Sequence, residues 1–270
     1  MFFGAFVIVF LAVWGLVYAT MPAGRGLLSF AARTVVRNAR VAKLVDTHGH
    51  QLRRYWPVVA LLVAGGALTA WAGDGFLDLA EMVHDKSAVL QETDQRVHDW
   101  FIVERGSDAT LFFTVMTIGG GPAGMAAISG IAAVVLLLGR RYRWVIYLAV
   151  TAGGGGLLNM ELKRYFARAR PDVAEMLRLA TGYSFPSGHA MGSMVVLGAL
   201  AYLASRAIPN WGGRSAAIAL AMVLTLSVSL SRVYLGAHWM SDIVAGLTAG
   251  GVWVTTTTVA YEVVRRIRPG

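Results

Sequence analysis

The sequence predicts an all-α protein, a polytopic transmembrane helical bundle of six to seven spans. Hydrophobic residues make up 56% of the 270 positions and charged residues only 14%, and the mean hydropathy is +0.58. This composition is too apolar for an ordinary soluble domain. Long apolar runs recur along the chain, and basic residues collect in some of the segments between them, as in multi-pass membrane proteins.

Seven apolar runs are candidate spans, because roughly 17–25 such residues cross the hydrocarbon layer as a helix. The first run lacks a basic start, so we expect a retained anchor rather than a cleaved signal peptide; without it the bundle has six spans. Gly-Gly-Gly-Pro at 119–122 is expected to bend or start the third span, and the glycines at 153–156 to allow close helix packing. The runs are residues 2–19, 56–73, 110–138, 144–162, 189–206, 215–231 and 239–261.

The charges between the runs predict the orientation of the bundle. Residues 20–54 carry seven Lys or Arg against one Asp, and residues 139–143 and the C-terminal end are also basic. Such segments stay in the cytoplasm. Residues 74–108 carry nine acidic residues against three basic ones, as a translocated loop does. Alternation then places 163–188 and 232–238 on the same outer side, and the N-terminus as well if the first run crosses.

The chain is expected to divide into two domains. Residues 1–54 would form an N-terminal membrane anchor and a basic amphipathic cytoplasmic segment, for which a solvated linker is the alternative. Residues 55–270 would form the main transmembrane domain, with a functional site built from the loops 163–189 and 231–242.

One outer loop departs from the charge rule. Residues 163–187 hold five cations against Asp172 and Glu175. An anionic ligand at the outer surface explains this excess, because Arg and Lys bind phosphate through charge-assisted hydrogen bonds. The alternative is that the stems of Arg164 or Arg168 reach up to lipid headgroups. The five cations are Lys163, Arg164, Arg168, Arg170 and Arg178.

Two short motifs frame this loop. Lys163 and Arg170 are seven residues apart, which is two helical turns, so both cations point one way. The sequence Pro-Ser-Gly-His puts Ser187 and the amides of Gly188 and His189 at the start of a span. Free N–H groups and the helix dipole make such a start an anion-binding position.

A third motif follows the sixth run. Arg232 lies just past this run, and His238 and Asp242 are four residues apart at the head of the seventh. At that spacing Asp242 can hold one ring nitrogen of His238 and leave the other free. A single histidine at a helix start is more often a polar cap, whereas the three motifs together are specific. The other histidines have no such surroundings and are expected at the surface: His48, His50, His84 and His98.

These motifs resemble those of the type 2 phosphatidic acid phosphatase family of integral membrane lipid phosphatases. The family pattern is Lys, six residues, Arg-Pro; Pro-Ser-Gly-His; and Ser-Arg, five residues, His, three residues, Asp. The chain matches it at 163–171, 186–189 and 231–242 without departure. Within the family, the stretch around residue 187 looks most like bacterial phosphatidylglycerophosphate and undecaprenyl diphosphate phosphatases.

The resemblance implies a mechanism and a set of roles. His238 would attack phosphorus to form a phosphohistidine, His189 would protonate the departing oxygen, and Asp242 would fix the tautomer of His238. The phosphate oxygens would be bound without a metal or other cofactor. The residues implied for this binding are Lys163, Arg170, Ser187, Gly188 and Arg232.

The expected protein is therefore a membrane lipid phosphatase with its active site on the outer face of the cell (inner) membrane. Its partners would be a lipid phosphate or diphosphate and the bilayer, and no nucleic acid. A lipid phosphotransferase using the same site, or a non-enzymatic lipid or anion transporter, remains as an alternative. Because a lipid brings its chains along, we expect the site to open sideways, near apolar residues of the acidic outer loop: Phe76, Leu77, Leu79, Trp100 and Phe101.

Overall fold

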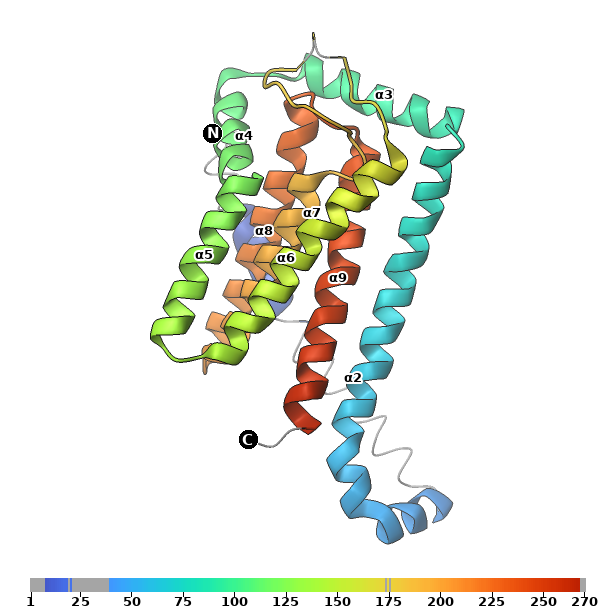
Figure 1. Ribbon diagram of the computed structural model, residues 1–270, viewed down its shortest axis with the longest axis vertical. Coiled ribbons are helices and arrows are strands. Elements are labelled where there is room, and N and C mark those ends of the chain that lie inside the picture. Colours follow the sequence, from blue (N-terminus) through green and yellow to red (C-terminus); the bar gives the residue numbers. More distant parts are fainter. Residues whose placement is uncertain (1–7, 19, 21–38, 173, 175, 268–270) are drawn as a thin grey trace.

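Every regular element of the described chain is a helix, which confirms the all-α class. The computed structural model describes residues 8–18, 20, 39–172, 174 and 176–267; within 39–172 it describes side chains from residue 58 onward. A helix Ile8–Tyr18 comes first. The others are α2 (Ala39–His84), α3 (Ala88–Val103), α4 (Ser107–Gly119), α5 (Pro122–Leu138), α6 (Tyr142–Phe166), α7 (Gly188–Ala207), α8 (Trp211–Tyr234) and α9 (Met240–Ile267) (Figure 1).

Five of these helices are long and apolar enough to cross a membrane: Val58–His84 within α2, and all of α6, α7, α8 and α9. A sixth span forms if α4 and α5 count as one, bent by 55° at the break between them. Pro122 starts α5 after Gly121, since proline fits the first helical turn but cannot continue a preceding helix. The expected bend at 119–122 is therefore confirmed, and six is the lower of the two predicted span numbers.

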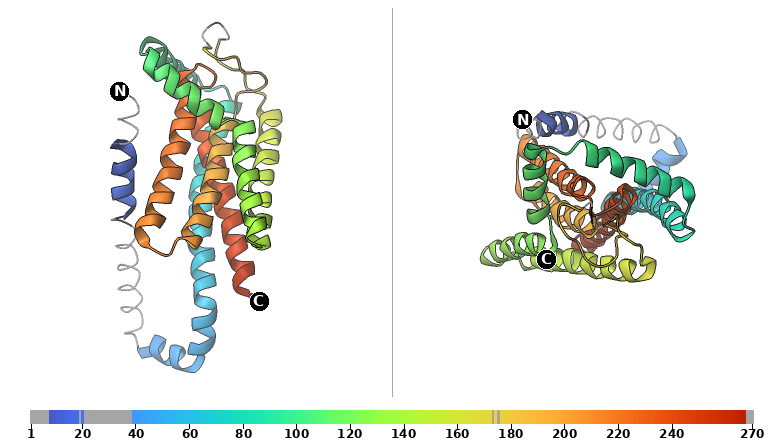
Figure 2. Two further views of the ribbon diagram at one scale, coloured as in Figure 1. Left: turned by 90° about the vertical axis from the view of Figure 1, so that its left-hand side faces the viewer. Right: turned by 90° about the horizontal axis from the view of Figure 1, so that it is seen from above.

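The helix Ile8–Tyr18 lies beside α8 (Figure 2). The indole N–H of Trp14 donates to the Ser215 hydroxyl at 3.0 Å, and that of Trp211 donates to the carbonyl oxygen of Tyr18. The rest of the first apolar run and most of the basic segment fall outside the described residues. Their predicted crossing and amphipathic helix thus stay predictions.

The predicted acidic outer loop is mostly helical. Its first part is the end of α2, and α3 then lies across the end of the bundle (Figures 1 and 2). The inner face of α3 carries Asp94 and His98, both at most 2% exposed, while Trp100 is 58% exposed. His98 is therefore buried, contrary to expectation, because it packs against the ring of Trp239 at 5.4 Å.

The apolar residues of this acidic segment divide into two groups. Phe76, Leu79 and Phe101 pack inward on the core, and the ring of Phe76 stacks on Phe185 at 6.1 Å. Leu77 and Trp100 remain exposed. Only these last two have the exposure that an interfacial anchor requires.

Close contact of α7 with α9 brings two of the sequence motifs together. A Cβ on Gly246 of α9 would lie 2.7 Å from the carbonyl oxygen of Ser187, at the start of α7. Only glycine allows this approach. The glycine run of α6 acts similarly, because a Cβ on Gly154 would lie 2.3 Å from the ring of Trp253, as close packing predicts.

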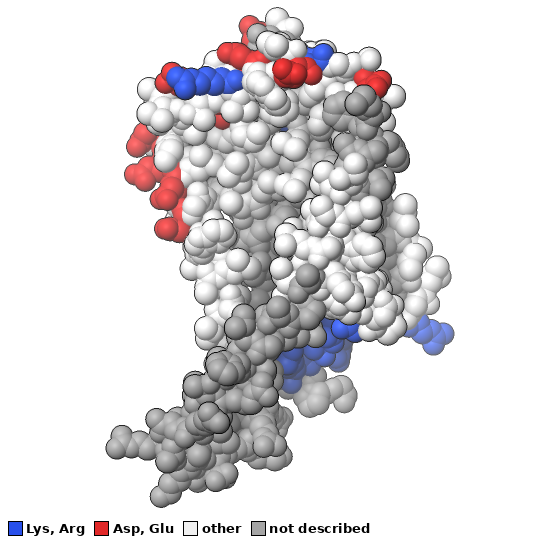
Figure 3. Space-filling view, turned by 180° about the vertical axis from the view of Figure 1, so that it is seen from behind, with Lys and Arg blue, Asp and Glu red and all other residues white. Residues whose placement is uncertain are grey.

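The two ends of the bundle differ in charge. Figure 3 shows Lys and Arg without Asp or Glu at the end that carries the α5–α6 turn, whereas the opposite end carries the Asp and Glu together with some Lys or Arg. The starts of α7 and α9 lie at this second end, so the three motifs lie there as well.

Candidate active site

The three sequence motifs meet at one cavity of about 560 Å³. Six of the eight predicted site residues line it: Lys163, Arg170, Gly188, His189, Arg232 and His238. Asp242 and Ser187 lie behind this lining, fully buried. The cavity is also lined by Thr117 and Asn159, which the sequence did not single out, and by Arg178, one of the five cations of the basic outer loop.

A tight turn places His238 over the end of α8. Gly236 has φ of 75°, a left-handed conformation that glycine adopts without strain. The N–H of Gly236 donates to the carbonyl oxygen of Val233, and the N–H of Ala237 donates to the carbonyl oxygen of Arg232. This is the Schellman arrangement that ends a helix. It returns the chain toward the cavity at once, so His238 and Arg232 line the same wall.

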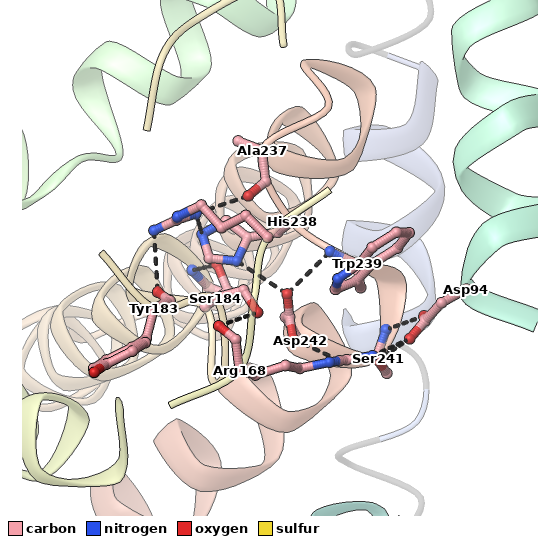
Figure 4. A network of polar contacts seen from close by, with 12 residues as sticks. Asp94, Arg168, Tyr183, Ser184, Ala237, His238, Trp239, Ser241 and Asp242 are labelled. Carbon is pink, nitrogen blue, oxygen red and sulfur yellow. Dashed lines mark hydrogen bonds and ion pairs between the residues drawn. The ribbon is translucent and has the colours of Figure 1, made fainter. Parts of the chain in front are cut away.

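Asp242 holds the inner side of the His238 ring. The Nδ1 atom of His238 lies 3.2 Å from Oδ2 of Asp242, and the backbone N–H of Trp239 donates to the same oxygen at 3.0 Å (Figure 4). Both side chains are at most 2% exposed. As the four-residue spacing predicts, Asp242 contacts one ring nitrogen of His238.

Arg170 defines the tautomer of His238. Its Nη1 atom lies 2.9 Å from Nε2 of His238, and a guanidinium is always a donor. Nε2 must therefore accept, which leaves the proton on Nδ1, facing Asp242. Burial, followed by the charges of Arg170 and Lys163, lowers the pKa of His238 well below its usual value. The ring is neutral at ordinary pH, with the lone pair of Nε2 on the cavity side.

The remaining donors of Arg170 fasten the connection between α6 and α7. They reach the carbonyl oxygens of Thr181, Gly182 and Tyr183 at 2.9–3.1 Å, and Nη1 also donates to Ala237 at 2.7 Å. All donor nitrogens of Arg170 are thus engaged with the protein. A phosphate that binds Arg170 has to replace one of these contacts. The contact with Nε2 of His238 is the one to be replaced, because Nε2 needs its lone pair free in order to react.

Lys163 and Arg232 keep donors for a ligand. The ammonium of Lys163 donates to the carbonyls of Tyr183 and Ser184, which leaves one of its three protons. Arg232 is 4% exposed, and its Nη1 donates to the hydroxyl of Thr117 at 2.6 Å. Its buried Nε has no hydrogen-bond partner among the described residues. An unpaired buried donor of a cation is costly, so this cavity wall is suited to an anion.

The start of α7 contributes backbone rather than hydroxyl groups. The Ser187 hydroxyl accepts from the N–H of Ala190 as the helix N-cap, and the Ser187 N–H donates to the carbonyl of Asp242. Ser187 therefore joins the second motif to the third. Gly188 and His189 face the cavity, where the positive end of the helix dipole favours an anion.

A buried ion-pair network behind the cavity was not predicted. Arg168 donates to Oδ1 of Asp242 at 2.8 Å and to Oδ2 of Asp94 at 2.8 Å (Figure 4). The alternative that Arg168 reaches lipid headgroups is wrong, because its side chain is only 13% exposed. Arg164, by contrast, is exposed and pairs with Glu161. The excess of charge in the loop was the only sequence signal for Arg168, and Asp94 had none.

An apolar groove adjoins the cavity. It has a volume of about 580 Å³ between α5, α6 and α7, and it shares Pro122, Asn159 and Gly188 with the lining of the cavity. Its other lining residues are small or apolar, among them Gly153, Gly156 and Gly192. The site therefore continues from a cationic end into an apolar trough along the helices.

Fold and site together define a multi-pass helical membrane protein in which a buried, neutral His238 pairs with the carboxylate of Asp242 beside a cationic cavity. Residues 143–266 match the sequence profile of the PAP2 superfamily. The predicted resemblance is therefore confirmed over this part of the chain.

Individual proteins show the same similarity. Phosphatidylglycerophosphatase B of Bacillus subtilis is 33% identical over 39% of this chain, which is about half, 52%, of that protein. Undecaprenyl-diphosphatase of Sulfolobus acidocaldarius is 38% identical over 30% of this chain and 35% of its own. A crystal structure of a transmembrane PAP2 type phosphatidylglycerolphosphate phosphatase from Bacillus subtilis superimposes with a TM-score of 0.69 at 26% identity, covering 74% of this chain and 98% of that one.

Proposed function

We propose that the protein is a lipid phosphatase that removes the terminal phosphate of a membrane lipid phosphate or diphosphate through a phosphohistidine on His238. The observation that carries this proposal is the lone pair of Nε2, held toward a cavity in which the buried Nε of Arg232 has no partner. A nucleophile and a vacant cationic donor on one cavity are what phosphoryl transfer needs.

The first step makes a bond from Nε2 of His238 to phosphorus and breaks the bond from phosphorus to the lipid oxygen. The proton on Nδ1 stays in its hydrogen bond to Asp242, whose charge stabilises the imidazolium that forms. His189 gives a proton to the departing oxygen. Lys163, Arg170, Arg232 and the Gly188 amide bind the remaining oxygens, where negative charge spreads in the transition state.

The second step returns the enzyme to its starting state. Water attacks phosphorus, His189 takes a proton from this water, and the bond from Nε2 to phosphorus breaks. Inorganic phosphate leaves, and Arg170 can resume its contact with Nε2. Chelation should therefore not stop the reaction, because these residues supply the positive charge that a divalent ion provides in other phosphatases.

The apolar groove supports a lipid rather than a soluble ester as substrate. A phosphate in the cavity would place its attached chain near Pro122 and Gly188, where the groove begins. The named relatives suggest phosphatidylglycerophosphate or undecaprenyl diphosphate, and the resemblance of the sequence motifs adds phosphatidic acid. The charge difference between the two ends of the bundle (Figure 3) supports an active site on the outer face of the inner membrane, because the basic end stays in the cytoplasm.

The decisive experiment traps the intermediate with a ³²P-labelled lipid phosphate. We expect an acid-labile phosphoenzyme in the wild type, none in His238→Ala, and an unchanged amount in His84→Ala, an exposed histidine that serves as the control. His189→Ala should slow formation of the intermediate by about 10²–10⁴-fold, less with a diphosphate, whose leaving phosphate is a weaker base. Orthovanadate should inhibit and EDTA should not. Phosphate release by His238→Ala at the wild-type rate would refute the proposal.

The same assay separates the two alternatives. A phosphotransferase would form the phosphoenzyme but pass the phosphoryl group to an added alcohol instead of water. A transporter would bind the lipid and form no phosphoenzyme. Comparing the three lipids above as substrates then identifies the preferred leaving group.

A further inference from the structure

Behind the phosphate site lies a network of buried charges centred on Arg168, shown in Figure 4. A single guanidinium, that of Arg168, bridges two carboxylates that are far apart in the sequence, Asp94 and Asp242. Their side chains are 3% and 0% exposed. Ser241 completes the bridge: its N–H donates to Oδ1 of Asp94 at 2.9 Å, and its hydroxyl contacts both Asp94 and Arg168.

The network limits how Asp242 can be placed. Oδ2 of Asp242 accepts from Trp239 and faces Nδ1 of His238, while Oδ1 is occupied by Arg168. Each oxygen thus has a fixed partner, and the plane of the carboxylate is set. Arg168 is held in turn from its far side by Asp94, so the guanidinium cannot swing away or turn toward the cavity.

Charge balance gives Asp94 a second task. A buried Arg168 facing Asp242 alone would neutralise much of the negative charge that stabilises a His238 imidazolium. The carboxylate of Asp94 balances the charge of Arg168 instead. The two carboxylates and one guanidinium then carry a net charge of −1, and the negative charge of Asp242 remains available to His238. The fork of an arginine suits this bridge, since two N–H groups on different nitrogens reach two acceptors at once, which an ammonium cannot reproduce.

We propose that Asp94, Arg168 and Ser241 are positioning residues of the phosphatase: they act through Asp242 to hold the His238 ring for attack. The proposal rests on the proposed function of His238. Asp94 comes from α3, which lies outside residues 143–266 that match the superfamily, so the outer helix takes part in the active site. None of the three lines the phosphate cavity, and their loss should affect rate rather than substrate binding.

The test compares kcat and KM in purified full-length variants. We expect Asp94→Asn, which keeps the shape of the side chain, to lower kcat by about 10- to 100-fold, as groups that orient a ligating histidine do in metal sites, with KM changed less than about twofold. Arg168→Lys should lose a similar factor, because it keeps the charge without the fork. Ser241→Ala leaves no charge unpaired, so kcat should fall by a smaller factor. This variant still tests the proposal if Asp94→Asn or Arg168→Lys fails to fold. The control is Asp99→Asn, an exposed carboxylate on the same helix that accepts a hydrogen bond from Gln95.

The decisive readout is a double mutant in which Asp94→Asn is combined with Asp242→Asn. If Asp94 acts through Asp242, the second change should add less than twofold to the loss caused by Asp242→Asn, whereas an independent structural role would multiply the two losses. Multiplied losses, or wild-type kcat in both Asp94→Asn and Arg168→Lys, would overturn the positioning role. Inactivity of His238→Ala in the same preparation would show that the nucleophile assignment survives such a failure.

Discussion

The substitution Arg232→Lys tests how the cavity grips phosphate, because it keeps the positive charge and changes only the arrangement of donors. Arg232 uses Nη1 on the hydroxyl of Thr117 and has a buried Nε without a partner among the described residues. A lysine ammonium has three donors at one point. It cannot keep Thr117 and also present a separate donor at the position of Nε.

The expected loss is therefore about one charge-assisted hydrogen bond to the transition state. Such a bond contributes about 1.5–3 kcal/mol, and each 1.36 kcal/mol is about tenfold in rate. We expect kcat/KM to fall by roughly 10- to 150-fold. If the cations served only to attract the anion by charge, lysine would work almost as well as arginine.

The assay measures phosphate release from phosphatidic acid in detergent micelles over a range of substrate concentrations. Arg214→Lys is the matched control, since Arg214 lies near the other end of α8 and bonds the carbonyl of Ile208. A thermal unfolding midpoint for each variant excludes loss of folded protein as the cause. A decrease of less than threefold in Arg232→Lys would refute the reasoning.

Three further predictions follow from other features. The neutral form of His238 attacks and its pKa is lowered by burial and by Arg170, so the acidic limb of kcat/KM should lie below the ordinary histidine pKa of about 6.5; a limb at or above this pH would contradict the assignment. Gly246→Ala should destabilise the protein by about 1–3 kcal/mol through overpacking, and Gly156→Ala should not, because its Cβ meets nothing within 4 Å; thermal unfolding compares them. Gly192→Leu, which projects into the apolar groove, should raise KM severalfold for long-chain phosphatidic acid and leave a water-soluble short-chain ester unaffected; equal effects on both would exclude the groove as the chain site.

Most of the fold was predictable because it depends on local properties of the chain. A membrane span is a contiguous apolar stretch, and its existence follows from composition over roughly 20 residues. The break at 119–122 follows equally from one proline and its glycines. The predicted end of the second apolar run, at residue 73, was not the end of the helix, since the acidic residues that follow continue α2 to His84. A helix does not have to end where it leaves the hydrocarbon layer, and polarity alone does not mark its last residue.

The candidate site divides in the same way. The sequence by itself determined the motif residues, because each motif lies at one end of a span and the spans bring these ends to one side of the bundle. The His238 and Asp242 pair is four residues apart on one helical turn, so local geometry also determined that contact. The turn that precedes the histidine is also a local property, because Gly236 favours the left-handed conformation that ends a helix.

Only the tertiary structure decided what surrounds these residues. The bridge from Asp94 to Arg168 joins positions 74 residues apart, and it exists because α3 lies across the bundle end with its polar face inward. The contact of Arg170 with Nε2 of His238, 68 residues away, depends likewise on how the α6–α7 connection folds over the cavity. An ion pair between distant segments leaves no periodic pattern in the chain; it is determined by the packing of helices, which places each charge where burial makes a partner necessary.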